Sequence, residues 1–314
     1  MRVSVIVAAY NVAQQIRRAL DSVAQQTFTD WEIVVVDDAS TDGTPFVVNA
    51  LAEVDARIRL VCQTWNQGPA AARNRGIAEA RGEWIAVLDA DDAWRPERLE
   101  RLLAIADESD ADYIVDNLVM FDEHLRRETG TAFSQGKETV PFTPTAMFSH
   151  ANPWEYGILK PMIRRGAFQR TGIRYDENLR FGEDFLLTAE LLFNGVRGVL
   201  AREGWYVYTT PVGHSSRQKS SGTRSTTSLG SLMWITDVLA QRYRDRITPE
   251  IAEGLARCRH RIQRRLIARE ITRLRQSRSL AGLAAYLIGH PRGALRYLTT
   301  SRTWSRAFGD RLAG

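Results

Sequence analysis

The chain has 314 residues, of which 44% are hydrophobic and 25% charged, a composition ordinary for a globular protein. Its two cysteines, Cys62 and Cys258, exclude a disulfide framework and a cysteine-rich zinc site. The N-terminus lacks the pattern of a signal peptide, and no apolar run reaches the about 18 residues expected of a transmembrane helix. We therefore expect a cytoplasmic protein that crosses no membrane.

The formal net charge of +5 conceals two regions of opposite charge. Residues 235–314 contain 17 arginines, no lysine and 6 acidic residues, a net charge of +11, which leaves −6 for residues 1–234. The sequence thus predicts an acidic body followed by a strongly basic C-terminal region.

The first hundred residues predict alternating strands and helices. In chain order we expect a strand over Val3–Ala9, a helix over Asn11–Gln26, strands over Trp31–Val36 and Ile58–Cys62, a helix over Gly68–Ala80 and a strand over Glu83–Leu88. Strands separated by helices of this length imply an α/β fold, with a parallel sheet and helices on both faces.

Polar residues follow three of these strands at the point where each strand ends. They are Tyr10-Asn11, Asp37-Asp38 and the cluster Asp89–Asp92. Ligands of parallel sheets bind beyond the carboxyl ends of the strands. The coincidence therefore predicts a binding site at this edge of the sheet.

The acidic cluster follows the apolar run of the fourth strand in the sequence V-L-D-A-D-D, residues 87–92. Gathering like charges costs free energy unless a cation or a proton neutralises them. Hard divalent metals prefer oxygen ligands and often reach phosphate-bearing substrates through one or two carboxylates. The alternative is a solvated acidic turn that caps the following helix.

Beyond Asp112 the pattern is less regular. We expect a strand over Tyr113–Phe121, a loop-rich segment over Phe133–Pro153, a helix over Phe185–Phe193 opened by Gly182-Glu183-Asp184, a strand over Trp205–Thr210 and a loop over His214–Ser228. Neither a G-x-G-x-x-G fingerprint after the first strand nor a G-x-x-x-x-G-K-[ST] motif occurs. These absences disfavour a dinucleotide-binding Rossmann domain and a P-loop NTPase.

Five motifs in order resemble the signature of family 2 glycosyltransferases, which have the GT-A fold. They are V-S-V-I-V-A-A-Y-N, I-V-V-V-D-D-A-S-T-D-G-T, N-Q-G-P-A-A-A-R-N-R-G, L-D-A-D-D and F-G-E-D-F-L-L, within residues 3–212. The stretch Gly157–Arg165, G-I-L-K-P-M-I-R-R, also resembles the bacterial exopolysaccharide subgroup that includes succinoglycan-type glucosyltransferases. The resemblance implies a Rossmann-like, mostly parallel central sheet flanked by helices.

The resemblance assigns the nucleotide to residues of the first half. Ala8 and Tyr10 are expected at the nucleobase, where the aromatic face of Tyr10 can stack; the alternative for Tyr10 is a core position. Asp38 is expected to accept the imide N–H of uracil, a proton that cytosine lacks, and this points to a UDP-sugar. Asp37 is expected instead to cap the following helix. Arg73 can reach the base or the phosphates, its alternative being a surface ion pair.

The acidic cluster matches the D-x-D motif of the family. The resemblance implies that Asp89 holds the ribose and that Asp91 coordinates Mg²⁺ or Mn²⁺, which bridges the diphosphate and stabilises UDP as it leaves. We expect Asp92 to cap the helix around Pro96–Leu103. His214 is expected near the diphosphate or the metal, as in some relatives; a solvated loop histidine is the alternative.

Glu183 and Asp184 match the acidic pair that carries the general base in this family. The resemblance implies that Asp184 removes the proton of the acceptor hydroxyl, which attacks the anomeric carbon opposite UDP and inverts its configuration. Glu183 is expected to orient the acceptor or the base. The alternative for both residues is an acidic pair at a helix N-terminus.

We therefore predict an inverting, metal-dependent hexosyltransferase that moves a sugar from a UDP-sugar, such as UDP-glucose. The expected acceptor is a hydroxyl of a glycan or a polyprenyl-diphosphate-linked oligosaccharide in bacterial surface or exopolysaccharide synthesis. Because the Q-x-x-R-W motif of processive synthases is missing, we expect one sugar to be added at a time. A sugar-phosphate nucleotidyltransferase and a non-catalytic nucleotide-sugar-binding scaffold are the alternatives.

Residues 1–234 are expected to form the catalytic domain, with a nucleotide-binding half over 1–111 and an acceptor-binding half over 112–234. Residues 235–314 are expected to form a helical arginine-rich region, in which apolar residues recur at helical spacing: Leu255, Cys258, Ile262, Leu266, Ile267, Ile271 and Leu274. Such a helix suits peripheral contact with an anionic membrane, on the inner face of the cell membrane. Docking on the catalytic body or homodimerisation are the alternatives, and no nucleic-acid-binding module is recognisable.

Overall fold

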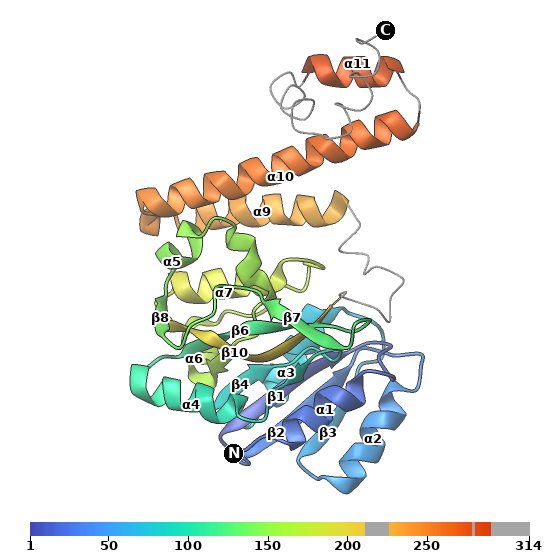
Figure 1. Cartoon of the computed structure of the whole chain (residues 1–314), viewed down its shortest axis with the longest axis vertical. Coiled ribbons are helices and arrows are strands. Elements are labelled where there is room, and N and C mark those ends of the chain that lie inside the picture. Colours follow the sequence, from blue (N-terminus) through green and yellow to red (C-terminus); the bar gives the residue numbers. More distant parts are fainter. Residues whose placement is uncertain (211–225, 278–279, 290–314) are drawn as a thin grey trace.

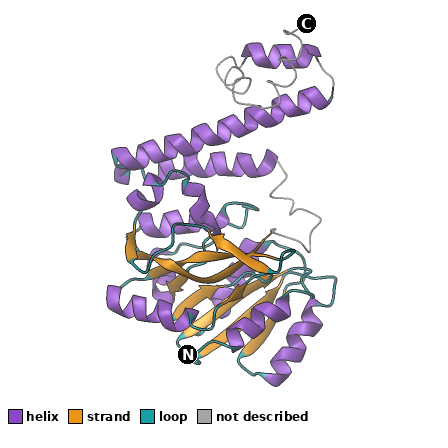
Figure 2. Cartoon of the chain, viewed as in Figure 1, coloured by secondary structure: helices purple, strands orange, loops and turns teal. Residues whose placement is uncertain are grey.

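The computed structural model describes residues 1–210, 226–277 and 280–289. A twisted sheet forms the centre, helices lie on both of its faces, and the C-terminal helices are stacked beyond one of them (Figures 1 and 2). The architecture is the expected α/β fold.

Ten described strands form one sheet in the order β3-β2-β1-β4-β9-β6-β10-β5, with β7 beside β6 and β8 beside β10. Their bounds are β1 Val3–Ala9, β2 Trp31–Asp37, β3 Ile58–Cys62, β4 Trp84–Val87, β5 Ala93–Trp94, β6 Tyr113–Asp122, β7 Arg127–Thr131, β8 Thr139–Phe142, β9 Met162–Arg164 and β10 Gly198–Thr210. Strands β1–β4 are mutually parallel, as are β6 and β10. The antiparallel strand β9 joins these two parallel groups.

The described α-helices are α1 Ile16–Ala24, α2 Thr44–Val54, α3 Pro69–Glu79, α4 Arg98–Ser109, α5 Pro144–Ser149, α6 Arg165–Thr171, α7 Glu183–Phe193, α9 Thr226–Arg242, α10 Pro249–Gln276 and α11 Leu280–Gly289. Two 3₁₀ helices, η1 Pro153–Ile158 and η2 Arg244–Arg246, complete the set.

The strands of the parallel half of the sheet are apolar because helices bury them on both faces. Every residue of β2 is buried, as expected for a strand covered by helices on both faces. Helix α3 packs closely on β1 because Gly76 has no side chain: a Cβ there would lie 2.4 Å from Ile6 Cγ2. This close packing fixes the position of Arg73 on the same helix.

Three predicted elements differ from the observed ones. Helix α1 begins at Ile16 and not at Asn11, whose φ of 53° is left-handed and whose Oδ1 accepts a hydrogen bond from Thr41 N–H. The expected loop over 133–153 contains β8 and α5, which are too short to give a periodic signal. The late strand is longer than predicted because β10 begins at Gly198 and continues through register shifts beside Gly204.

A buried ion pair ties the second half of the sheet together. Arg98 on α4 is 0% exposed, and its guanidinium pairs with Asp116 on β6, which is 1% exposed. The Arg98 guanidinium lies closest to Asp116 Oδ1. Asp116 Oδ2 accepts hydrogen bonds from the backbone N–H groups of Trp205 and Tyr206, where β10 bulges. Arg98 also donates to the carbonyl of Lys160, just before β9.

The C-terminal helices pack on the body of the protein. Helix α10 contacts α9 and α5, and Arg257 and Arg261 donate to the carbonyls of Phe148 and Ala151. The expected domain boundary at residue 234 falls inside α9. None of the described helices is both long and apolar enough to span a bilayer.

We predict that replacing Asp116 by alanine lowers the free energy of unfolding by about 3–5 kcal/mol, because Arg98 is left as an unpaired buried charge. Urea unfolding at neutral pH measures the change. The matched control is Arg75→Ala, which removes an exposed ion pair with Glu79 and should cost about 0.3–0.5 kcal/mol. Equal effects of the two substitutions would contradict the prediction.

Candidate active site

The carboxyl ends of β1, β2 and β4 lie side by side, as predicted. Ala9 of β1 pairs with Asp37 of β2, and β1 also pairs with β4. Tyr10, directly after β1, is 48% exposed and therefore not a core residue. Ala8 is half-buried on β1. This edge of the sheet presents an aromatic ring to solvent beside several carboxylates.

Asp38 is buried and organises the loop that leads into α3. Its Oδ1 accepts hydrogen bonds from Gln67 N–H at 2.7 Å and from Gln63 Nε2 at 2.6 Å, and its Oδ2 accepts one from Gly68 N–H at 2.7 Å. A carboxylate has about four acceptor positions. Asp38 therefore holds this loop in place and has capacity for about one further donor.

The helix-capping role expected for Asp37 is wrong. Asp37 Oδ2 accepts a hydrogen bond from Ser40 N–H, within the loop. The N–H of Thr44, where α2 begins, instead donates to Asp42 Oδ1. Asp42 lies two residues before the helix, close enough to reach its first turn, whereas Asp37 still belongs to β2.

The capping role expected for Asp92 is also wrong. Asp92 is 2% exposed, and its carboxylate accepts hydrogen bonds from the Tyr206 hydroxyl at 2.8 Å and from Thr209 N–H at 2.7 Å. The same Tyr206 hydroxyl accepts a hydrogen bond from Asp89 N–H. Asp92 thus attaches the acidic turn, residues 89–92, to β10. The first turn of helix α4 is capped by Gln26 instead, whose Oε1 accepts a hydrogen bond from Leu99 N–H.

The side chains of Arg73 and Lys160 connect Asp89 of the acidic turn to the first residues of α7. Arg73 lies 2.9 Å from Asp89 Oδ1, 2.9 Å from Glu183 Oε1 and 3.2 Å from Asp184 Oδ1. Lys160 Nζ lies 2.9 Å from Asp89 Oδ2 and 2.7 Å from Asp184 Oδ2. We name these five residues the carboxylate cluster. It brings together predicted site residues that are far apart in the sequence.

Arg73 is 5% exposed, so the alternative of a surface ion pair is wrong. Lys160 is equally buried. Both cations are held between Asp89, two residues after β4, and the carboxylates of α7. Each is needed to balance a cluster that contains three acidic groups.

The pKa values in the cluster follow from burial and from these ion pairs. Burial alone would raise the pKa of Asp89, but the charges of Lys160 and Arg73 outweigh burial and hold that pKa below its ordinary value. Burial would likewise lower the pKa of Lys160, whereas Asp184 and Asp89 raise it. Burial and the neighbouring Asp184 raise the pKa of Glu183. Asp89 and Lys160 are therefore both ionised at neutral pH.

Asp184 has two oxygens in different environments. Oδ2 accepts a hydrogen bond from Lys160 Nζ. Oδ1 is buried and accepts no hydrogen bond from the described residues, although Arg73 lies 3.2 Å away. Asp184 and Glu183 stand in the first turn of α7, after Gly182 with its left-handed φ of 86°. Asp184 Oδ1 thus has a vacant acceptor position in the cluster.

Lys160 is a site residue that sequence reasoning missed. The chain contains three lysines against 39 arginines, and Lys160 stands in the apolar run Leu159-Lys160-Pro161-Met162. An isolated lysine among buried apolar residues was the available signal, because a lysine is seldom buried without a partner.

Asp91 differs from the other acids of the turn. Its carboxylate forms no salt bridge within the described part of the chain, and burial together with the charge of Asp89 raises its pKa. A carboxylate in that setting fits a cation. The described residues contain no group of three or more His, Cys, Asp or Glu side chains that could hold a metal ion by themselves. The site therefore suits a metal ion whose coordination shell is completed by oxygens of the bound substrate. His214 lies outside the described residues.

Comparisons with known proteins identify relatives of this chain. The family profile described as "Glycosyl transferase family 2" matches residues 4–170. Succinoglycan biosynthesis protein ExoO of Rhizobium meliloti (strain 1021) is 40% identical over 223 residues, 68% of this chain and 62% of ExoO. ExoU of the same organism is 37% identical over 206 residues, 62% of this chain and 58% of ExoU. The chain thus matches about three fifths of the length of each of these two relatives.

Solved structures share the fold. The S. aureus TarS 1-349 structure in complex with UDP-GlcNAc has a TM-score of 0.65 at 22% identity and covers 93% of this chain and 92% of that one. The mannosyltransferase PcManGT from Pyrobaculum calidifontis, in complex with GDP-Man and Mn²⁺, has a TM-score of 0.57 at 21% identity, covering 97% and 82%. With the matched profile, the ordered motifs and the GT-A fold, the chain belongs to glycosyl transferase family 2.

Proposed function

We propose that this protein is an inverting, metal-dependent glycosyltransferase. It moves a single sugar from a UDP-sugar, such as UDP-glucose, to a hydroxyl of a glycan or a lipid-linked oligosaccharide in bacterial surface or exopolysaccharide synthesis. The observation that carries the proposal is the carboxylate cluster. In it, Arg73 and Lys160 hold the D-x-D residue Asp89 beside Asp184, so that a donor and a base meet in one site.

The donor nucleotide is assigned to the ends of β1 and β2. The exposed ring of Tyr10 offers a face for the nucleobase, and Ala8 lies two residues earlier, on β1. The remaining acceptor position of Asp38 suits the imide N–H of uracil. Asp89 is assigned to the ribose. The TarS structure, which is a complex with UDP-GlcNAc, supports a uridine donor.

Asp91 is assigned to Mg²⁺ or Mn²⁺. When bound, the metal neutralises charge on the diphosphate as UDP leaves. The protein contributes a carboxylate that no described basic side chain already pairs with, while Asp92 and Tyr206 fix the turn that presents it. The PcManGT structure, which is a complex with GDP-Man and Mn²⁺, supports a metal in this fold.

Asp184 is assigned as the general base. Its Oδ1 accepts the proton of the acceptor hydroxyl while the acceptor oxygen forms a bond to the anomeric carbon. The bond from that carbon to the phosphate oxygen breaks, and UDP departs with the electron pair. Attack from the face opposite UDP inverts the anomeric configuration. Lys160, bonded to Oδ2, orients the carboxylate, and Glu183 orients the acceptor or the base.

A peripheral contact with an anionic membrane is part of the proposal. Arg264 and Arg265 are exposed on α10, and Ile288 on the apolar helix α11 is 80% exposed. Basic and apolar groups together favour an anionic bilayer surface. A lipid-linked acceptor would then be reached from the cytoplasmic side. Homodimerisation through these helices is the alternative.

We predict that Asp184→Asn lowers the rate of transfer by about 10²–10⁴-fold, the usual contribution of a general base. Binding of UDP with Mg²⁺ should be retained, because the assigned nucleotide residues are unchanged. Rates come from UDP release in a screen of UDP-sugars and acceptors, and affinities from calorimetry. The control is Asp110→Asn at an exposed position. Full activity of the Asp184 variant would remove this residue from the base role.

We predict that a chelator abolishes turnover of the UDP-sugar and that added Mg²⁺ or Mn²⁺ restores it. Asp91→Asn should raise the metal concentration needed for half-maximal rate by about tenfold or more, because one anionic ligand is lost. The measurement is a metal titration of UDP release. Activity in chelator equal to that with metal would contradict the metal assignment.

We predict that the full-length protein sediments with vesicles that contain phosphatidylglycerol and that Arg264→Glu with Arg265→Glu weakens this binding by about tenfold or more, since each basic residue contributes about 1 kcal/mol. The matched control reverses Arg17 and Arg75, which are exposed on α1 and α3. Equal binding by both double variants would count against a membrane role for α10, and light scattering would then test dimerisation.

A further inference from the structure

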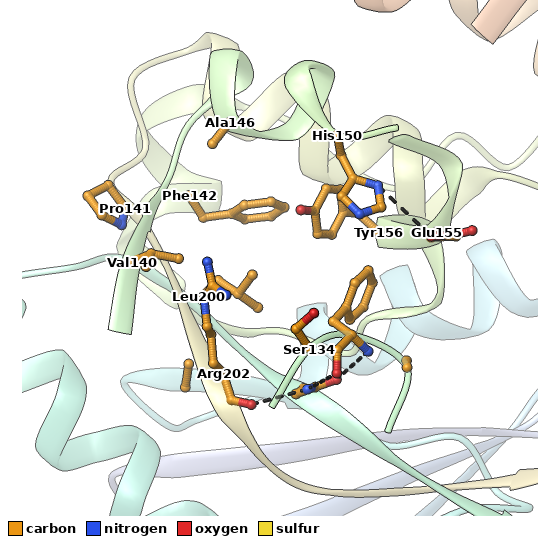
Figure 3. Close-up of a pocket in the computed structure, with 14 residues that line it drawn as sticks. Ser134, Val140, Pro141, Phe142, Ala146, His150, Glu155, Tyr156, Leu200 and Arg202 are labelled. Atoms are coloured by element: carbon orange, nitrogen blue, oxygen red, sulfur yellow. Dashed lines mark hydrogen bonds and ion pairs between the residues drawn. The ribbon is translucent and has the colours of Figure 1, made fainter. Parts of the chain in front are cut away.

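A second cavity, of about 540 Å³, lies outside the carboxylate cluster. Its walls come from β6, β8, β10, α5 and η1, and it is open between the side chains labelled in Figure 3. Ligand sites for small molecules have volumes of about 300–1,000 Å³. None of its lining residues belongs to the donor site proposed above.

Tyr156 is the most informative residue of this cavity. The residue as a whole is 9% exposed, but its hydroxyl is not among the buried unpartnered atoms, and it forms no hydrogen bond with any described residue. Figure 3 shows the ring between Phe142 and His150, with its hydroxyl end on the side of Phe142. Ring contacts fix this position, because Tyr156 stacks on Phe133 at 5.1 Å between centroids and meets Phe142 at 5.0 Å. A hydroxyl that lines a cavity and has no partner in the described part of the chain is available to bond a ligand.

The cavity is lined by charged groups of both signs. Arg202 enters from β10 and also pairs with Glu138 at 3.3 Å. Glu155 of η1 also lines the cavity: its Oε1 accepts a hydrogen bond from Asn152 Nδ2, and its other oxygen lies 3.9 Å from His150 Nδ1. Burial raises the pKa of Tyr156, so its hydroxyl stays protonated and can donate.

These groups select the chemical class of the ligand. A phosphate or carboxylate would face the Glu155 carboxylate, and an ammonium group would face the Arg202 guanidinium. A neutral polyhydroxy compound can donate to the carboxylate and accept from the guanidinium and from the Tyr156 hydroxyl. The aromatic walls meanwhile suit the C–H groups of a sugar ring. A saccharide meets all of these conditions.

The elements that form the cavity wall pack against the helix that carries the candidate base, Asp184. Tyr156 lies four residues before Lys160 on the same segment. Its element η1 packs on α7: the Trp154 and Phe185 rings are 4.2 Å apart, and a Cβ on Gly157 would lie 3.1 Å from Phe185 Cβ. Phe185 directly follows Asp184. The wall of the cavity and the base therefore belong to two elements in close contact.

We propose that this cavity binds a saccharide unit of the acceptor other than the unit that receives the sugar, with the Tyr156 hydroxyl bonded to one of its hydroxyl groups. The inference rests on the proposed function, because it takes the acceptor to be a glycan. It adds a second binding position, on the acceptor side of the sheet, to the site of transfer.

The test uses the full-length protein and three disaccharides, cellobiose, maltose and lactose, as probes in saturation-transfer NMR titrations. Tyr156→Phe removes the hydroxyl and keeps the ring, and Ala146→Trp narrows the cavity from α5. The matched control is Tyr243→Phe, a buried tyrosine directly after α9 that does not line the cavity and whose hydroxyl accepts a hydrogen bond from Asn194. Circular dichroism checks the fold of each variant, and metal-dependent hydrolysis of UDP-glucose is measured on the same samples.

At least one disaccharide should bind the unmodified protein. Tyr156→Phe should raise its Kd by about 3- to 10-fold, the effect of one hydrogen bond. Ala146→Trp should raise it further, and Tyr243→Phe should leave it unchanged. Hydrolysis should be the same in all four proteins, because the substitutions lie outside the carboxylate cluster.

Two other results overturn different proposals. If no disaccharide binds, or if binding is unchanged in both cavity variants, the saccharide site is wrong even where hydrolysis is normal. If Tyr156-dependent binding is found while the unmodified protein hydrolyses none of a panel of UDP-sugars, the transfer chemistry is wrong and the saccharide site stands.

Discussion

The candidate site depends on two buried cations that three carboxylates share. Asp89 stands at the end of β4, whereas Glu183 and Asp184 open α7, and like charges brought this close would repel each other strongly in a protein interior. Arg73 and Lys160 turn that repulsion into attraction because each one contacts carboxylates of both elements. These ion pairs stabilise the arrangement. They also place Asp89, the residue assigned to the ribose, beside the candidate base Asp184.

A second layer of hydrogen bonds holds this cluster in place. The buried pair of Arg98 and Asp116 reaches the cluster in two directions: Arg98 bonds the backbone carbonyl of Lys160, and Asp116 bonds the N–H of Tyr206. The Tyr206 hydroxyl in turn bonds Asp89 N–H and Asp92. Both halves of the site are thereby fixed to one support on α4 and β6, as accurate chemistry requires of groups that must act together.

Features that depend on the local residue pattern could be predicted from the sequence, whereas features that depend on contacts between distant residues could not. The strands up to β4 and the acidic residues at their ends follow from apolar runs and from ordered motifs. The role of Asp92 was missed because its partners, Tyr206 and Thr209, lie more than a hundred residues away. Lys160 stands in an irregular segment without periodicity, so only the folded chain places it between Asp89 and Asp184. The elements β8 and α5, of 4 and 6 residues, are too short to give a periodic signal.

The most direct test of the claim that the shared cations hold the site together is a double-mutant cycle between Lys160 and Asp184. The free energy of unfolding of each variant is measured by urea unfolding at neutral pH. Lys160→Met and Asp184→Asn should each destabilise the protein, because each leaves a partner with less compensation. The double variant should cost less than the sum of the two, with a coupling energy of about 1–3 kcal/mol. Additive effects, with no coupling, would contradict the claim that this ion pair holds the site together.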